Sequence, residues 1–168
     1  MVVADVSRGD GKDYSAFHVI DMEALVQVAE YKDQIGTREY GNLLVSVATE
    51  YNDALLVVEN NNVGWDVVNT VIDRGYKNLY YSSKKDEISA TDWMYRDTMS
   101  DMIPGFSVTS KNRPLIITKL LEYIGDHICI IRSKRLVDEM RVFIWKNGKA
   151  QAQEARYRDW ETIGRAHV

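Results

Sequence analysis

Short apolar runs separated by polar turns dominate the first thirty residues. The runs cover residues 2–6, 16–20 and 25–29, and two glycines within 9–11 supply turn chemistry between the first two runs. Short runs of this kind, joined by short polar turns, are typical of an antiparallel meander. We therefore expect the chain to begin with three antiparallel strands.

Apolar positions then change to helical spacing. From Tyr40 onward they recur every three or four residues, and Thr37 is a suitable N-cap for the helix that this predicts. The run 55–58 is continuously apolar, as in a strand covered on both faces. The asparagines at 60–62 suit a loop or a cap, and the helix that follows them is predicted to close at Gly75.

The second half of the chain continues the alternation of strands and helices. Residues 82–109 have weak periodicity and are predicted to form a long excursion. Pro114 suits the first turn of a helix, and Ser133 can cap another. The predicted strands of this half are 79–81, 128–131 and 142–145. This order of elements predicts an α/β fold, with helices packed on a mixed sheet.

Composition limits the function classes. The chain has 168 residues with 45% hydrophobic and 27% charged residues, which suits one globular domain. No apolar run approaches the roughly 20 residues that a membrane helix needs, so we expect no membrane partner. The single cysteine excludes a disulfide framework and a multi-cysteine zinc site. The net charge of −4 excludes nucleic-acid binding through bulk positive charge, although a local basic strip is compatible with it.

Two acidic residues occupy unusual positions. Asp5 lies within the first apolar run, and Glu59 directly follows the run 55–58. An ionised carboxylate beside a core strand is costly unless a cation or a donor compensates it, and Mg²⁺ prefers carboxylate oxygens. A pair of such ions can support phosphodiester cleavage. For an arbitrary chain, the simpler interpretation is that Asp5 begins a turn and Glu59 caps the next helix.

Other polar residues give weaker signals. Asp13 could be a further ligand or an acid that supports one, although a turn-forming Asp is the simpler interpretation. The three histidines lack metal-binding spacing. Positive charge clusters locally, as a DNA-backbone track would require, but a solvated surface explains it equally well. The basic residues of these clusters are Lys84, Lys85, Lys111, Arg113, Arg132, Lys134 and Arg135.

Several segments resemble the nuclease domain of large terminase subunits from tailed, myovirus-like phages. Residues 5–16 (DVSRGDGKDYSA) resemble the first nuclease motif of that family, and residues 57–64 (VVENNNVG) resemble the second. The resemblance continues to about Tyr157. It includes the pattern between the second and third motifs and the approach to the third, at residues 104–106, 112–116, 132–140 and 148–154.

The resemblance implies an RNase H-like, retroviral-integrase-like fold: a mixed sheet with antiparallel first three strands and helices on both faces. It implies a metal-dependent endonuclease that uses Mg²⁺ or Mn²⁺, with two ions expected, and cuts concatemeric viral DNA during genome packaging. Asp5 and Glu59 match the first two catalytic, metal-binding acids of the family, and Asp13 matches an acid after the first motif. The implied partners are double-stranded DNA and, in the full-length protein, a packaging ATPase domain, a small terminase and a portal, in the host cytoplasm.

The sequence departs from the family in three ways. The packaging ATPase is absent, and residues 163–168 resemble the translation of a sequencing adapter. The third motif usually reads Tyr-x-Asp-Asp before an apolar helix, whereas here Asp159 is followed by Trp160. We therefore expect a nuclease domain over 1–157, incomplete at its C-terminus, and a non-native tail over 158–168. Asp159 then matches the third acid in position alone, and a fragment of this kind can be inactive.

Two other functions are compatible with the same fold. A non-catalytic RNase H-like module would bind or dock on DNA without turnover. A junction resolvase would keep the chemistry and prefer branched DNA. A fold alone does not separate these functions, because one fold hosts many activities.

Overall fold

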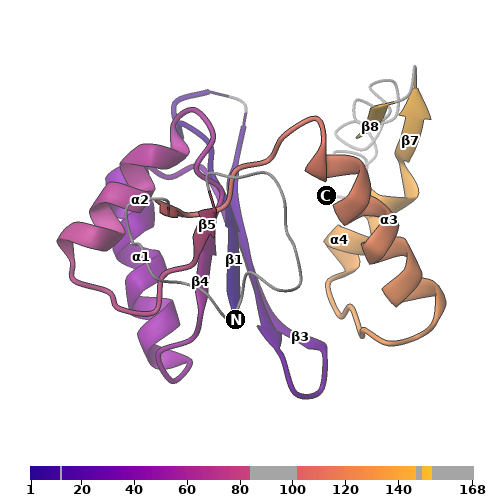
Figure 1. The fold of residues 1–168 in the computed structure, drawn as a ribbon, viewed down its shortest axis with the longest axis horizontal. Coiled ribbons are helices and arrows are strands. Elements are labelled where there is room, and N and C mark those ends of the chain that lie inside the picture. Colours follow the sequence, from indigo (N-terminus) through magenta and orange to yellow (C-terminus); the bar gives the residue numbers. More distant parts are fainter. Residues whose placement is uncertain (12, 84–101, 147–148, 153–168) are drawn as a thin grey trace, which may run out of the picture. The chain divides into compact units, whose positions relative to one another are not determined.

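The computed structural model describes residues 1–11, 13–83, 102–146 and 149–152. Its contacts divide the chain into two compact units, Met1–Thr109 and Ser110–Val168 (Figure 1). Among the described residues, the first unit holds a four-stranded sheet, a two-stranded sheet and two helices, and the second holds two helices and a two-stranded sheet. Both units therefore combine helices with strands.

Strands and helices alternate along the chain. In the first unit the elements are β1 (Val2–Asp5), β2 (Ser15–Asp21), β3 (Val26–Asp33), α1 (Thr37–Glu50), β4 (Leu56–Val58), α2 (Gly64–Asp73), β5 (Tyr81–Ser83) and β6 (Met102–Pro104). In the second unit they are α3 (Asn112–Gly125), α4 (Lys134–Arg141), β7 (Phe143–Lys146) and β8 (Lys149–Ala152). The predicted α/β class is confirmed.

The main sheet has the strand order β3-β2-β1-β4. The pairs β1–β2 and β2–β3 are antiparallel, as predicted, whereas β1 and β4 are parallel. Parallel neighbours need a crossover connection, and here it runs through β2, β3 and α1. The sheet is therefore mixed, and β1 lies between an antiparallel and a parallel neighbour.

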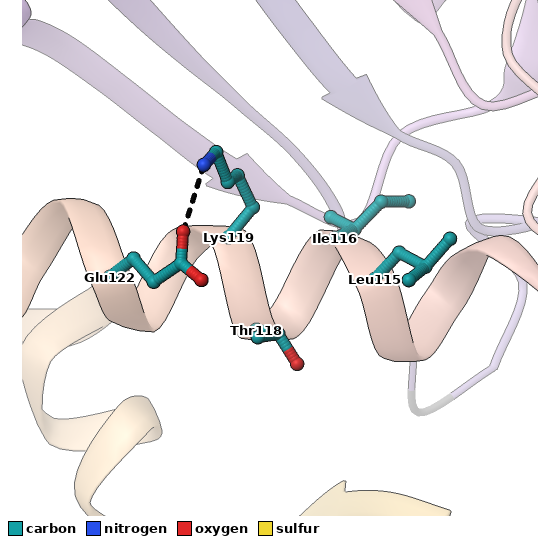
Figure 2. Close-up of a pocket in the computed structure, with 5 residues that line it drawn as sticks. All are labelled: Leu115, Ile116, Thr118, Lys119 and Glu122. Carbon is teal, nitrogen blue, oxygen red and sulfur yellow. Dashed lines mark hydrogen bonds and ion pairs between the residues drawn. The ribbon is translucent and has the colours of Figure 1, made fainter. Parts of the chain in front are cut away.

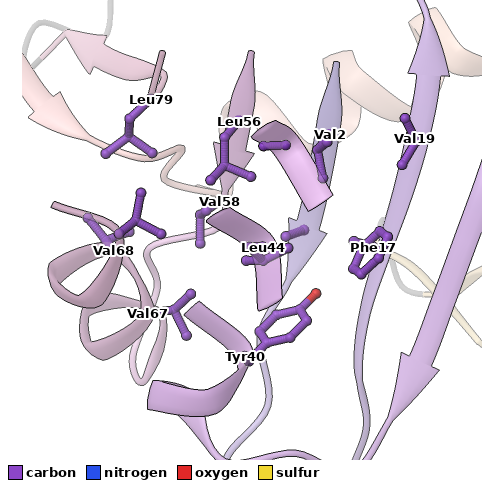
Figure 3. Packing of buried hydrophobic residues seen from close by; sticks show 13 residues of the cluster. Val2, Phe17, Val19, Tyr40, Leu44, Leu56, Val58, Val67, Val68 and Leu79 are labelled. Carbon is purple, nitrogen blue, oxygen red and sulfur yellow. The ribbon is translucent and has the colours of Figure 1, made fainter. Parts of the chain in front are cut away.

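One face of this sheet is covered by α1 and α2. Alternate residues of β1, β2 and β4 are buried, because successive side chains of a strand point to opposite faces. They pack with the apolar stripes of the two helices (Figure 3). The core cluster consists of Val2, Ala4, Phe17, Val19, Tyr40, Leu44, Ala48, Leu56, Val58, Val67, Val68, Val71 and Leu79. Full burial of one such aliphatic side chain contributes about 1.5–3 kcal/mol.

The two helices also approach each other closely. A Cβ on Gly41 of α1 would lie 2.7 Å from the Cβ of Thr70 in α2. Because Gly41 has no side chain, the backbone of α1 packs directly against the side chain of Thr70 in α2. This contact holds α1 and α2 together as one layer over the sheet.

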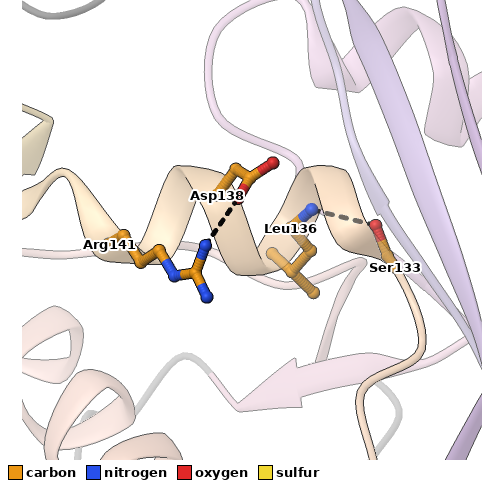
Figure 4. A network of polar contacts seen from close by, with 4 residues as sticks. All are labelled: Ser133, Leu136, Asp138 and Arg141. Atoms are coloured by element: carbon orange, nitrogen blue, oxygen red, sulfur yellow. Dashed lines mark hydrogen bonds and ion pairs between the residues drawn. The ribbon is translucent and has the colours of Figure 1, made fainter.

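Several predicted boundaries are confirmed and others are wrong by one or two residues. Ser133 is the N-cap of α4, and its Oγ accepts a 2.9 Å hydrogen bond from the N–H of Leu136 (Figure 4). Gly75, with φ 71°, follows the C-cap of α2 as predicted. The N-cap of α1 is Gly36 rather than Thr37, and it makes no side-chain cap.

The predicted strand at 128–131 is wrong, because those residues form none of the strands. Helix α3 continues to Gly125, and the chain then reverses through His127, which has φ 56°. Ile128 and Ile130 are exposed. A four-residue apolar run is compatible with a strand but does not require one. Strand β8, which was not predicted, pairs instead with β7 in an antiparallel hairpin.

Within the described ranges, every helix is too short or too polar to cross a bilayer.

Candidate functional site

A pair of acids ends two neighbouring strands of the main sheet. Strands β1 and β4 run parallel, with Ala4 opposite Val58. The N–H of Glu59 donates a 2.9 Å hydrogen bond to the carbonyl of Ala4, so the ladder continues one residue beyond β4. Asp5 and Glu59 are the next residues of the two strands. They therefore occupy equivalent positions at the carboxyl ends of adjacent parallel strands.

Both acids belong to the sheet face that points away from α1 and α2. Ala4 and Val58, one residue earlier on each strand, are buried against those helices. The alternation of side chains along a strand then directs Asp5 and Glu59 to the opposite face. Asp5 is exposed and Glu59 is half-buried. The sheet thus brings together two acids that are more than fifty residues apart in the sequence.

A tight turn leads from Glu59 into α2. The N–H of Gly64 donates to the carbonyl of Asn61 over 2.9 Å. A Cβ on Gly64 would overlap the carbonyl oxygen of Glu59. The absence of a side chain at Gly64 therefore lets α2 begin directly beside the acid.

Two asparagines after Glu59 bind a distant segment through their side chains. The Asn60 Nδ2 donates to the carbonyl of Pro104, and its Oδ1 accepts from the Ser107 hydroxyl, both over 2.8 Å. The Asn61 Nδ2 donates to the carbonyl of Val108 over 2.8 Å, and its Oδ1 accepts from the Val108 N–H over 2.9 Å. Sequence reasoning assigned these asparagines only to a loop or cap. The available signal was a run of carboxamides directly after a buried strand.

Main-chain bonds complete this attachment on the far side of β4. The N–H of Phe106 donates to the carbonyl of Val58 over 2.8 Å, and the N–H of Asn60 donates to the carbonyl of Phe106 over 3.0 Å. Gly105 allows the approach, since a Cβ there would lie 2.7 Å from the Val58 carbonyl oxygen. Glu59 and Phe106 form a parallel bridge. The backbone of Glu59 is therefore flanked by chain on both sides.

The loop between β1 and β2 carries Asp13 and is held by side-chain hydrogen bonds. The Ser7 hydroxyl donates to the Asp13 carbonyl over 3.2 Å, and the Ser7 N–H donates to the Oγ of Ser15 over 3.0 Å. The Gln34 Nε2 donates to the Gly11 carbonyl over 2.6 Å. These bonds fix the main chain around Asp13, whose side chain is exposed.

Among the residues that the structure describes, no group of three or more His, Cys, Asp or Glu side chains is placed to hold a metal ion. Asp5 and Glu59 are thus a pair, and a role for Asp13 as a ligand stays a prediction. Asp159, the expected third acid, lies outside the described residues.

A buried phenol lies on the helical side of the sheet. Tyr40 of α1 is fully buried, and its hydroxyl has no hydrogen-bond partner within the described part of the chain. Its ring stacks on Tyr31, which in turn stacks on Phe17, with centroid distances of 6.4 and 5.2 Å. Burial raises the pKa of Tyr40, and the negative charge of Asp5 raises it further. The site acid and this phenol are therefore electrostatically coupled.

The predicted DNA-binding cations that the structure describes belong to the second unit. They lie around the starts of its two helices: Lys111 is the N-cap of α3 and Arg113 is in its first turn, while Arg132, Lys134 and Arg135 surround the start of α4. Lys111, Arg113, Arg132 and Lys134 are exposed, and Arg135 is half-buried. Lys84 and Lys85 lie outside the described residues.

The second unit also has a shallow depression on α3, with a volume of about 400 Å³ (Figure 2). Its walls come from one helix only: Leu115, Ile116, Thr118, Lys119 and Glu122. Lys119 and Glu122 form an exposed ion pair of 2.8 Å across one end. The depression offers no carboxylate pair and no buried polar group, so its residues do not suggest a catalytic site.

Three solved structures resemble this chain in fold. The large terminase nuclease of the thermophilic phage G20c with bound magnesium has a TM-score of 0.65 and 15% identity over 90% of this chain and 70% of the other. The same nuclease with bound cobalt has a TM-score of 0.65 and 15% identity, over 91% of this chain and 71% of the other. With bound zinc, the TM-score is 0.61 and the identity 16%, over 88% of this chain and 71% of the other.

No family model and no curated protein sequence matches the chain. The likeness is therefore structural, and at 15% identity it concerns the fold alone. The mixed sheet, with three antiparallel strands and a parallel fourth, agrees with the RNase H-like architecture expected from the sequence. The chain has the α/β, RNase H-like fold of the large terminase nuclease.

Proposed function

We propose that this chain is a metal-dependent DNA endonuclease domain of the large-terminase type. The observation that carries the proposal is the pairing of Asp5 and Glu59 at equivalent positions of adjacent parallel strands. This pair lies in a fold shared with the G20c terminase nuclease. The substrate would be double-stranded DNA, cut by hydrolysis of phosphodiester bonds.

The two carboxylates suit a hard divalent cation. Mg²⁺ and Mn²⁺ favour carboxylate oxygens, and Mg²⁺ keeps several of its waters, so few protein ligands are needed. The exposure of Asp5 gives a hydrated ion access to the pair. Two acids on adjacent strands also repel each other, and a cation relieves that repulsion. The magnesium, cobalt and zinc bound in the G20c nuclease structures support a divalent ion here, and we propose two.

Such ions, when bound, supply an activated water and stabilise charge on the leaving oxygen. Asp5 and Glu59 would act as the ligands that hold them, from strand positions fixed by the sheet. A fixed carboxylate pair needs little rearrangement during the reaction, which favours stabilisation of developing charge. Asp159 is proposed as a third ligand, and Asp13 as a further ligand or an acid that supports one.

The basic residues would hold the DNA without reading its sequence. Lys111 and Arg113 begin α3, and Lys134 and Arg135 begin α4. The start of a helix favours an anion, because its first N–H groups carry partial positive charge. A DNA phosphate there can accept hydrogen bonds from those N–H groups and contact the cations beside them. We therefore propose backbone contacts at both helix starts, together with Arg132, Lys84 and Lys85.

A plasmid-nicking assay on the 168-residue chain tests the proposal. We expect Mn²⁺ or Mg²⁺ to support conversion of supercoiled to open-circular DNA, and EDTA to stop it. Asp5→Asn and Glu59→Gln should each abolish nicking and Mn²⁺ binding, measured by electron paramagnetic resonance. Asp10→Asn is the matched control, because it removes one exposed negative charge from the loop between β1 and β2. Equal cleavage by Asp5→Asn and wild type would contradict the mechanism.

A non-catalytic DNA-binding module is the second candidate. The observation that favours it is that the described acids form a pair and not a larger group. It predicts DNA binding that weakens with salt and no nicking with any divalent ion. Nicking that depends on Asp5 excludes it, and a preference for branched over linear DNA in the same assay would indicate a junction resolvase.

The wider setting follows from the same proposal. A terminase nuclease would act on concatemeric viral DNA in the host cytoplasm. Its partners would be a packaging ATPase domain, a small terminase and a portal. Co-purification of such proteins with the chain during phage infection would test this setting.

A further inference from the structure

The side chain of Asn61 imitates a strand residue. In a sheet, a main-chain residue donates one hydrogen bond and accepts another from its neighbour. The Asn61 carboxamide does the same with Val108: its Nδ2 donates to the carbonyl over 2.8 Å, and its Oδ1 accepts from the N–H over 2.9 Å. The ladder beside β4 therefore continues through a side chain after the strand itself has ended.

This side-chain pairing adds to the bonds that Val58 and Asn60 make with residues 104–108. Strand β4 has only three residues, and the bridge between Glu59 and Phe106 is isolated. The Asn61 bonds come two residues after each member of that bridge. Together with the bonds of Val58 and Asn60, they keep residues 104–108 alongside the acid, so that the backbone of Glu59 has a chain segment on each side.

Glu59 is correspondingly restrained on every side of its backbone. Its N–H is bound to Ala4 on one flank, and its bridge partner Phe106 occupies the other. Its carbonyl oxygen lies against Gly64. The flank at Phe106 is held by main-chain bonds to Val58 and Asn60 and also by side-chain hydrogen bonds, of which Asn61 supplies two.

We infer that Asn61 is a positioning residue for Glu59: its side chain helps to hold the segment 104–108 beside the end of β4 and so fixes the carboxylate for metal binding. The inference rests on the proposed function. Residues that orient metal-binding carboxylates without touching the metal typically affect metal affinity 10–100-fold. Loss of the Asn61 pairing should therefore weaken binding by about 10–100-fold.

The substitution Asn61→Asp separates positioning from electrostatics, because the two effects have opposite signs. Asp has nearly the same shape as Asn but lacks the Nδ2 donor, so the bond to the Val108 carbonyl is replaced by repulsion between oxygens. Asp also adds a negative charge two residues from Glu59, which by itself favours a bound cation. Weaker binding in Asn61→Asp would therefore reflect lost positioning and not charge.

Asn62→Asp is the matched control. Asn62 is exposed, and its side chain has no hydrogen bond to the described part of the chain. It has φ 51°, a conformation that Asp tolerates about as well as Asn. This variant adds the same charge one residue further on and leaves the Asn61 pairing intact. We expect it to bind Mn²⁺ as well as wild type or slightly better.

The test measures Mn²⁺ affinity of the 168-residue chain by electron paramagnetic resonance, with thermal unfolding of the apo form alongside. We expect weaker binding in Asn61→Asp at a temperature where it remains folded. If Asn61→Asp binds Mn²⁺ as tightly as wild type or more tightly, while Asp5→Asn has lost binding, the role of Asn61 is overturned and the metal site is retained. No binding by wild type would overturn the metal site and this inference together.

A measurement on wild type avoids any folding defect of the variant. The Val108 N–H is bound to Asn61 Oδ1, so its hydrogen exchange reports the pairing directly. If the pairing fixes the metal site, binding must stabilise the pairing in return. We expect saturating Mg²⁺ to slow Val108 exchange at least several-fold. An exchange rate of the Val108 N–H that stays unchanged when the chain has bound Mg²⁺ would contradict the inference.

Discussion

Glu59 and Gly64 are in direct main-chain contact: the carbonyl oxygen of Glu59 occupies the space that a Cβ on Gly64 would need. The contact joins the end of β4 to the start of α2, which packs its buried face on the same sheet. A change at Gly64 must therefore move either the helix or the acid. This makes the glycine a sensitive reporter of how Glu59 is held.

We expect Gly64→Ala to lower the free energy of unfolding by about 1–3 kcal/mol, the range typical of overpacking. It should also weaken Mn²⁺ binding, because relief of the overlap displaces the Glu59 backbone. Chemical denaturation and Mn²⁺ titration measure the two effects. Gly11→Ala is the control, since a Cβ there meets nothing within 4 Å. A Gly64→Ala protein with wild-type stability would show that the turn is not tight.

Local sequence signals predicted much of the fold. The short apolar runs near the start of the chain and the continuous run before Glu59 predicted the strands of the main sheet, and the cap at Ser133 was identified correctly. These features depend on neighbours in the sequence. The failed strand at 128–131 shows the limit of this approach: an apolar run lacks information about whether a partner strand exists.

A metal-binding role for both Asp5 and Glu59 was predicted from their positions and from the family resemblance, and the parallel register of β1 and β4 agrees with a shared site. The Asn61 pairing could not be predicted in the same way. Its partner Val108 is 47 residues away and lies in a segment with weak periodicity. Contacts between a side chain and a distant main chain leave no periodic pattern in the sequence.

Metal binding should stabilise the folded chain. At a concentration 100 times the dissociation constant, a ligand that binds only the folded state adds about 2.7 kcal/mol to the free energy of unfolding. We expect Mg²⁺ or Mn²⁺ to raise the melting temperature of wild type and to leave that of Asp5→Asn unchanged. Calorimetry with and without EDTA measures the difference.

The apo forms provide an independent check on the same pair. Two acids at equivalent strand positions repel each other, so Asp5→Asn should melt at the same temperature as apo wild type or higher. Asp10→Asn should keep the metal-dependent rise. A rise of equal size in Asp5→Asn would show that the ion binds elsewhere.

Tyr40→Phe should not destabilise the protein near neutral pH. Among the described residues the buried Tyr40 hydroxyl has no hydrogen-bond partner, a lack that typically costs about 1–3 kcal/mol, and Phe keeps the ring that stacks on Tyr31. We expect the free energy of unfolding to stay constant or to rise. Tyr51→Phe, at an exposed position, is the control. A loss of more than about 1 kcal/mol would show that the hydroxyl has a partner.

The same phenol predicts a pH dependence. In the folded chain the pKa of Tyr40 is raised above its ordinary value of 10.0, chiefly by burial. Below pH 10 the phenol is neutral in both states, and its contribution to stability is fully present. Above pH 10 the unfolded chain loses this proton while the folded chain keeps it, so stability falls by about 1.4 kcal/mol per pH unit. Urea unfolding from pH 8 to 11 should show this fall in wild type, and a smaller one in Tyr40→Phe.

DNA binding should depend on the cations at the start of α4. Each phosphate contact contributes about 0.9 to the slope of log K against log salt, so Lys134→Ala and Arg135→Ala should each reduce the slope by about 1. Arg141, which pairs with Asp138 at 3.1 Å (Figure 4), is the matched control because it lies at the other end of α4. Fluorescence anisotropy with duplex DNA at several salt concentrations measures the slopes. If Arg141→Ala and Lys134→Ala reduce the slope equally, the helix contributes only general positive charge. A reduction confined to the variants at the helix start would support a phosphate bound there.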